Sequence, residues 1–255
     1  MNWRIILAGT AAVAVSLGLG TARVARADLR TYTIDPNLSS LTITGNLTDN
    51  FASEQTSGSL TTSFSGTIVA DHTAGHISFP GGSALDAALQ SVNQQPRADA
   101  TPGSAPADYG RTAPGPFSTT ALEALRGIIL DVEDDTGGAG ITLTGSNFAS
   151  NSLVLVVSQG SSDVIYGNAS AETDLSGKGT SNGSGNGASS VVASGSNETL
   201  TLKFSTGSIG YGVSQSGDSS ISFFGTIVAT SVPEPASMIM LGGAAAGALL
   251  RRRRV

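Results

Sequence analysis

The sequence contains no cysteine, and among its 255 residues only 13% are charged and 5% are aromatic. Without cysteine the chain cannot form a disulfide framework, a thiolate zinc site or a cysteine nucleophile. The small charged fraction argues against a helical bundle or coiled coil, which would be rich in Ala, Glu, Lys and Leu. We therefore expect the fold to be stabilised by a hydrophobic core.

Small residues are abundant instead, with 36 Ser, 26 Thr and 33 Gly. Polar and apolar residues alternate with period two in segments rich in Thr, Ile and Val, which predicts half-buried strands. These segments are Thr31 to Ile34, Leu41 to Leu47, Leu60 to Ala70, Ile141 to Thr144, Leu200 to Phe204 and Ile221 to Ala229. The continuous apolar runs Gly127 to Val132 and Leu153 to Val157 predict central strands covered on both faces.

The remaining segments predict short helices and long loops. Ala84 to Val92 has helical apolar spacing behind Ser83, a candidate N-cap, and a second short helix is expected around Thr120 to Arg126. Asn93 to Pro116 holds five of the nine prolines, and Ser176 to Ser196 is almost wholly Gly, Ser and Asn. We expect both tracts to be exposed loops, because neither can bury enough apolar surface. The predicted fold is an all-β, sandwich- or barrel-like antiparallel domain.

One internal similarity joins two predicted strands. SFSGTIVAD (Ser63 to Asp71) and SFFGTIVAT (Ser222 to Thr230) agree at seven of nine positions. We interpret them as equivalent or neighbouring long strands of one sheet. Gly66 and Gly225 are expected to mark a bulge or bend in each.

Charge is distributed unevenly along the chain. The segment from Asp28 to Glu234 carries all 19 acidic residues and only six basic ones, a net charge of −13. Such an acidic body is a poor ligand for nucleic acid. The other basic residues lie near the two ends.

The first 27 residues have the pattern of a signal peptide. Arg4 provides the charged region, Ile5 to Gly20 the apolar run, and Ala25 and Ala27 an A-x-A cleavage site. We expect cleavage after Ala27 and a β-rich extracellular domain from residue 28 to 231.

The C-terminal tail has three parts: Pro233, Glu234 and Pro235, then the short apolar segment Ala236 to Leu250, then Arg251, Arg252, Arg253 and Arg254. As a transmembrane helix the apolar segment would be short, and the arginines would hold its far end in the cytoplasm. This tail resembles the PEP-CTERM sorting domain of exported bacterial proteins, also called the ice-binding protein C-terminal domain. The resemblance implies transient anchoring in the membrane, recognition by an exosortase, cleavage near the motif, and a link to exopolysaccharide and biofilm.

Candidate ligand sites in the body are weakly specified. Asp131, Glu133 and Asp135 would share one face of a strand and could offer oxygens to calcium, although a solvated turn explains them as well. His72 and His76 fit a polar hairpin tip better than a metal site. The sequence therefore predicts no metal, no cofactor and no catalytic site.

Two further patterns have ordinary explanations. Gly179, Ser181 and Gly183 match G-x-S-x-G, but they lie in a low-complexity tract instead of a strand-to-helix turn. Thr-x-Thr pairs at Thr31, Thr42, Thr142 and Thr199 lack the fixed period expected of an ice-binding ladder, and Thr is a common outward residue of strands.

These observations favour a non-enzymatic exported surface or matrix protein, sorted by an exosortase and linked to biofilm or exopolysaccharide. A carbohydrate-binding or adhesive module is the alternative, using aromatic residues in loops: Tyr109, Phe117, Tyr166 and Tyr211. A secreted hydrolase that uses two carboxylates is a third possibility.

Overall fold

The computed structural model describes residues 29–47, 56–73, 75–88, 90–91, 106–114, 120–166, 169–195, 197–213 and 217–231. The strands are β1 (Leu29–Ile34), β2 (Ser40–Leu47), β3 (Thr56–Thr73), β4 (His76–Ser78), β5 (Ala84–Ala87), β6 (Gln90–Ser91), β7 (Pro106–Ala107), β8 (Tyr109–Pro114), β9 (Thr120–Asp134), β10 (Ile141–Thr142), β11 (Asn147–Phe148), β12 (Leu153–Tyr166), β13 (Ala169–Asp174), β14 (Gly179–Ser181), β15 (Ser189–Ser194), β16 (Asn197–Ser205), β17 (Ile209–Val213) and β18 (Gly217–Ser231). The one helical element among the described residues is the 3-10 turn η2 (Ser150–Ser152).

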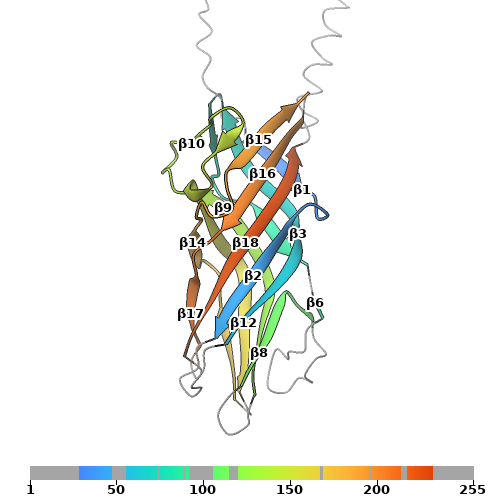
Figure 1. The fold of residues 1–255 in the computed structure, drawn as a ribbon, viewed down its shortest axis with the longest axis vertical. Coiled ribbons are helices and arrows are strands. Elements are labelled where there is room, and N and C mark those ends of the chain that lie inside the picture. The colour runs from blue at the N-terminus through green and yellow to red at the C-terminus, as the bar shows by residue number, and fades with distance from the viewer. Residues whose placement is uncertain are drawn as a thin grey trace, which may run out of the picture.

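Sixteen of these strands form one antiparallel sheet, with the main order β11-β15-β16-β18-β1-β3-β5-β9-β12-β13. The long strands β3, β9, β12 and β18 run along the longest axis of the molecule (Figure 1). β1 and β2 lie one after the other between β3 and β18, and both pair with both long strands. The predicted all-β fold is confirmed.

The segment of β14 joins β12 to the end of β16, two strands that lie far apart along the sheet path. Asn182 forms a bridge with Thr206, and the Gly183 N–H donates to the Ser205 carbonyl at 2.9 Å. The sheet therefore curves around and encloses one continuous hydrophobic core. Its largest fully buried side chains are Tyr32, Phe64, Phe79, Phe204, Phe223, Leu41, Ile43, Ile68, Ile77 and Leu85.

Strand formation follows the alternation in the sequence. Along β16 every second residue is buried, so that Leu200, Leu202 and Phe204 enter the core while Thr199 and Thr201 face outward. The same pattern corrects the expectation that two apolar runs are covered on both faces. Within Gly127 to Val132 and Leu153 to Val157 the residues between the buried ones stay at least partly exposed, so only one face of each run is fully covered.

Both predicted helices are wrong. Residues Ala84–Ala87 form β5, in which Leu85 and Ala87 are buried and Asp86 is exposed. β5 pairs with β3 and with β9, and these long-range pairings outweigh a weak local helix preference. The segment Thr120 to Arg126 is the beginning of β9 and pairs with β8 and β12.

The expectation of an exposed loop over Ser176 to Ser196 is wrong in part: most of the described tract is exposed, but it is not a continuous loop. This tract contains β14 and β15, and its Asn182 and Ser189 side chains are buried. Asn182 donates to the carbonyls of Ser150 and Lys203 and accepts from the Ser205 N–H, which fixes the tract to β16. In the other tract, Pro106 to Pro114 forms β7 and β8, and the rest lies outside the described residues.

The two similar segments occupy equivalent places in the sheet, as predicted. Ser63 to Asp71 lies in β3 and Ser222 to Thr230 lies in β18, on opposite sides of β1 and β2. Gly66 is opposite Leu85, and Gly225 is opposite Leu41. The backbone has φ of 108° at Gly66 and 153° at Gly225.

The equivalence extends to a serine hydroxyl near each glycine. The Val69 N–H donates to Ser83 Oγ at 3.0 Å, and the matching Val228 N–H donates to Ser39 Oγ at 2.9 Å. A Cβ at Gly66 would lie 2.0 Å from the Ala84 carbonyl oxygen, and one at Gly225 would lie 2.3 Å from that of Ser40. Both positions therefore require glycine. At Gly66 the close neighbour is the start of β5, directly after Ser83, and at Gly225 it is the start of β2, directly after Ser39.

Candidate functional site

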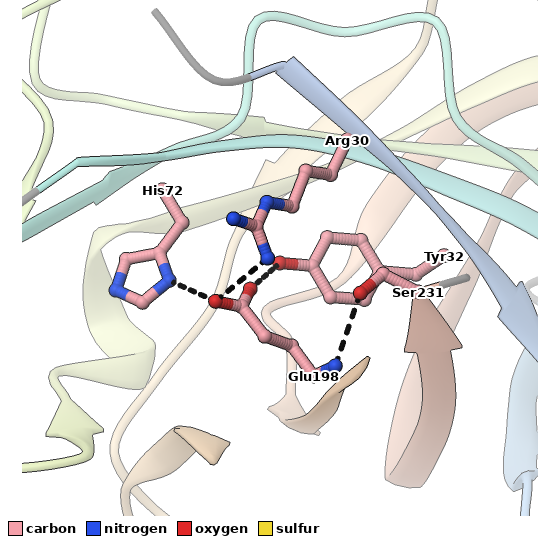
Figure 2. A network of polar contacts seen from close by, with 5 residues as sticks. All are labelled: Arg30, Tyr32, His72, Glu198 and Ser231. Atoms are coloured by element: carbon pink, nitrogen blue, oxygen red, sulfur yellow. Dashed lines mark hydrogen bonds and ion pairs between the residues drawn. The ribbon is translucent and has the colours of Figure 1, made fainter. Parts of the chain in front are cut away.

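A buried carboxylate, Glu198, lies inside the end of the sheet where β1 begins and β18 ends. Three side chains meet it: Tyr32 donates its hydroxyl to Oε2 at 2.7 Å, Arg30 Nη1 lies 2.8 Å from Oε1, and His72 Nδ1 lies 3.0 Å from Oε1. Figure 2 shows all three directed at the carboxylate from β1 and β3. With Ser231 they form what we call the Glu198 cluster.

Burial makes these contacts important to stability. The Glu198 side chain is 8% exposed and Tyr32 is completely buried. A carboxylate removed from water in this way must be compensated by opposite charge and hydrogen bonds. The Glu198 cluster supplies both, and it closes this end of the hydrophobic core.

The same cluster joins the first and last described strands. Ser231, the last residue of β18, is opposite Tyr32 of β1 and also opposite Glu198 of β16. The Glu198 N–H donates to Ser231 Oγ at 3.1 Å, a bond drawn in Figure 2. The N-terminal and C-terminal ends of the described chain therefore lie at one end of the molecule.

A second buried carboxylate, Glu123 of β9, has a related environment. Its Oε1 accepts hydrogen bonds from the hydroxyl of Tyr211 and, at 3.0 Å, from that of Ser162. Tyr211 pairs with Ser219 near the beginning of β18, whereas the Glu198 cluster holds the end of that strand. The core thus has a carboxylate bound by a tyrosine near each end of β18.

Asp108 has a carboxyl group whose pKa is strongly perturbed. Burial, assisted by the nearby charge of Asp86, raises the pKa of Asp108 from 3.8 to about 6. The Ile128 N–H, which donates to its Oδ2 at 2.6 Å, and the charge of Arg126 act in the opposite direction. Its Oδ1 is buried without a hydrogen-bond partner.

The carboxylates considered for calcium are used by the fold or exposed. Asp131 accepts the N–H groups of Gly82 and Ser83, each at 2.8 Å, and so holds the turn before β5. Glu133 and Asp135 are exposed. Within the described part of the chain, no three His, Cys, Asp or Glu side chains are grouped closely enough to hold a metal ion.

The structure places several other residues that the sequence singled out. His72 and His76 flank the β3–β4 turn as predicted, but the His72 ring also contacts Glu198, 126 residues away in sequence. Tyr211 is 3% exposed and cannot serve as a surface platform for sugars. Ser181 lies in β14 opposite Val154, without the strand-to-helix turn of a nucleophile. Phe117 and the side chains of Tyr109 and Tyr166 lie outside the described residues.

The outer surface of β16, β18, β1, β2 and β3 carries rows of hydroxyl groups. Register aligns Thr199, Thr230, Thr33 and Thr67 in one row; Lys203, Thr226, Ser40 and Ser63 in a second; and Ser205, Phe224, Thr42 and Thr61 in a third. We call these twelve residues the hydroxyl face. Phe224 is 50% exposed, and Lys203 is the one charged member of the twelve.

Comparison with known proteins identifies the tail. A family profile described as the PEP-CTERM protein-sorting motif matches residues 231–254. The match begins at Ser231 of the Glu198 cluster, and the resemblance seen in the sequence is confirmed. No curated protein and no solved structure is significantly similar to the chain.

The matched motif is that of exported proteins whose membrane-anchored precursors are processed by an exosortase. Pro233, Glu234, Pro235 and the four arginines lie within the matched range and outside the described residues, as do Ala25 and Ala27 of the predicted signal peptide. Among the residues that the structure describes, no helix is both long and apolar enough to span a membrane.

Proposed function

We propose that the chain is a non-enzymatic surface or matrix protein that an exosortase releases or transfers, and that it contributes to biofilm or exopolysaccharide organisation. The observation that carries this proposal is the sorting motif placed directly after the last strand of a closed β domain. Supporting it, the buried carboxylates Glu198 and Glu123 are occupied by hydrogen bonds within the fold. Because both carboxylates are buried, neither is within hydrogen-bond reach of a substrate at the surface, as a general acid or base must be.

The test uses the full-length precursor in cells that process it. Glu234→Ala should leave the precursor in the membrane fraction, because the acidic residue of the motif is lost while the apolar segment and arginines remain. Immunoblots of membrane and released fractions measure the outcome, and unaltered processing would count against sorting by this motif. The released protein should hydrolyse no polysaccharide; turnover would contradict the non-enzymatic assignment.

Carbohydrate binding is a second candidate function, and the hydroxyl face favours it. This surface presents ten Ser or Thr side chains around Phe224, in an otherwise acidic domain. Hydroxyl groups can both donate and accept hydrogen bonds, as sugar hydroxyls do, and an exposed aromatic ring can stack on the apolar face of a sugar ring. A neutral polysaccharide fits this chemistry better than a charged one.

The released protein can be tested on a glycan array. Phe224→Ser should weaken binding of a neutral glycan by roughly tenfold, about 1.4 kcal/mol, without lowering stability, because the ring is half exposed. Val192→Ser is the matched comparison, since Val192 is 48% exposed and lies opposite Thr199 at the edge of the same face, so that it tests whether the loss is specific to Phe224. Equal binding by both variants and the parent would exclude this face.

A further inference from the structure

A single residue separates the folded domain from the sorting motif. Ser231 ends β18, Val232 follows, and Pro233 begins the Pro-Glu-Pro sequence. Two Cα-to-Cα steps span at most about 7.6 Å, so the motif cannot move far from the end of the sheet. An exosortase that reads this motif must therefore work directly against the folded domain.

The end of β18 is held on both sides. Ser231 and Thr230 are opposite residues of β1 on one side and of β16 on the other. Ser231 is 3% exposed, and its hydroxyl accepts the Glu198 N–H. While it is paired on both sides, this stretch of backbone is not available to pair with the binding cleft of a processing enzyme.

The Glu198 cluster strengthens this hold. Arg30 and Tyr32 of β1 and His72 of β3 all contact the carboxylate of Glu198, which belongs to the strand on the other side of β18. These side chains bridge over the inner side of β18 and fix β1 to β16. Releasing the end of β18 disturbs both neighbours and the cluster that joins them.

We propose that the Glu198 cluster is a latch on processing: the exosortase cleaves the tail only when the end of β18 opens from β1 and β16. This inference rests on the proposed sorting by the Pro-Glu-Pro motif and adds a regulatory role for the domain. Where local opening is rapid, cleavage of an opened segment follows the population of the open state. Loosening the latch therefore accelerates processing of the full-length precursor.

The two tyrosine–carboxylate pairs supply a matched comparison. Tyr32→Phe removes one hydroxyl from Glu198, and Tyr211→Phe removes one from Glu123 at the other end of β18. We expect Tyr32→Phe to increase the processing rate in a pulse-chase experiment by roughly tenfold, as expected for one lost hydrogen bond to a charged group. Tyr211→Phe, which weakens the fold elsewhere, should process at the parental rate.

Separating the motif from the domain provides a test that leaves the fold intact. Inserting Gly-Ser-Gly-Ser between Ser231 and Val232 should accelerate processing, and Tyr32→Phe should then add nothing further. Equal acceleration by both tyrosine variants would show that global unfolding, not the latch, limits the reaction. Slower processing of the insertion variant would show that the enzyme uses the closed end as part of its substrate, which would also overturn the latch.

Failure of the latch is distinguishable from failure of sorting. If Glu234→Ala blocks processing while Tyr32→Phe and the insertion leave its rate unchanged, the motif directs sorting and the domain end does not control it. If Glu234→Ala is itself processed normally, the proposed sorting is wrong. Circular dichroism of each variant checks that a change in rate does not reflect an unfolded domain.

Discussion

Tyr32 and Glu198 are 166 residues apart in sequence, yet the tyrosine hydroxyl donates to the carboxylate at 2.7 Å inside the sheet. The contact joins β1, the first described strand, to β16, and the last residue of β18 lies between these two strands. Neither residue is adjacent to the tail, but together they fix the place from which the tail leaves. The fold therefore connects the two ends of the domain through a single buried anion.

Removing this anion should destabilise the protein strongly. Glu198→Ala removes the buried carboxylate that Arg30 Nη1 and the Tyr32 hydroxyl both contact. We expect the free energy of unfolding to fall by about 3–5 kcal/mol. Urea denaturation measures this change, and Glu133→Ala is the control because Glu133 is exposed. Similar losses in both variants would mean that the cluster has no special role in stability.

The repeated glycines should not accept a side chain. Gly66→Ala and Gly225→Ala each place a Cβ within 2.3 Å of a carbonyl oxygen, which forces the paired strands apart. We expect each variant to lose on the order of 3 kcal/mol or to fail to fold. Gly210→Ala is the control, because a Cβ there meets nothing within 4 Å. Normal stability of the Gly225 variant would argue against the close approach of Ser40.

The two serines near these glycines, Ser39 and Ser83, should differ in importance. Ser39 Oγ accepts the Val228 N–H and donates to the Val228 carbonyl, whereas Ser83 Oγ accepts the Val69 N–H. Ser39→Ala therefore removes two hydrogen bonds and should cost about 2 kcal/mol, roughly twice the cost of Ser83→Ala. Thermal unfolding of the two variants side by side tests the order, and the reverse order would contradict it.

The strands could be predicted from the sequence because alternation is a local signal. The equivalence of β3 and β18 could also be predicted, because the two similar segments share seven residues. One of these is the glycine that is opposite a buried leucine in each strand. The helix expected over Ala84 to Val92 failed because Leu85 is opposite both Gly66 and Leu130, contacts that no local window contains. The prediction of a continuous loop over Ser176 to Ser196 was wrong for the same reason. Asn182 is held by hydrogen bonds to Lys203 of β16 and to Ser150, which are distant in sequence.

The Glu198 cluster could not be predicted from the sequence. Arg30, His72 and Glu198 carry no common motif, and their spacing has meaning only after β1, β3 and β16 have come together. In β16 every second residue is buried, so Glu198 lies on the same inward face as Leu200 and Leu202. A charged residue at such a position was the one sign in the sequence that a buried polar cluster exists. The tail, in contrast, is a short contiguous motif and was identified from its residues alone.

Stability should depend on the ionisation of Asp108. Because burial raises its pKa from 3.8 to about 6, the folded protein binds this proton more tightly than the unfolded chain does between these pH values. The contribution of Asp108 is therefore present below pH 4 and is lost as pH rises to about 6, by on the order of 2 kcal/mol. Asp108→Asn keeps an acceptor for the Ile128 N–H and should remove this dependence. Urea unfolding from pH 4 to 7 tests it, and parallel curves for parent and variant would contradict it.

The arginines at the end of the chain should matter to processing even when the Pro-Glu-Pro motif is intact. Arg251 to Arg254 follow a short apolar segment, and positive charge on the cytoplasmic side sets the position of such a segment in the membrane. Replacing all four with Ser should let the segment shift outward and should lower the processed fraction severalfold. Replacing them with Lys preserves the charge and should preserve processing. Immunoblots of membrane and released fractions distinguish the two variants; equal processing would mean that charge at this end does not position the motif.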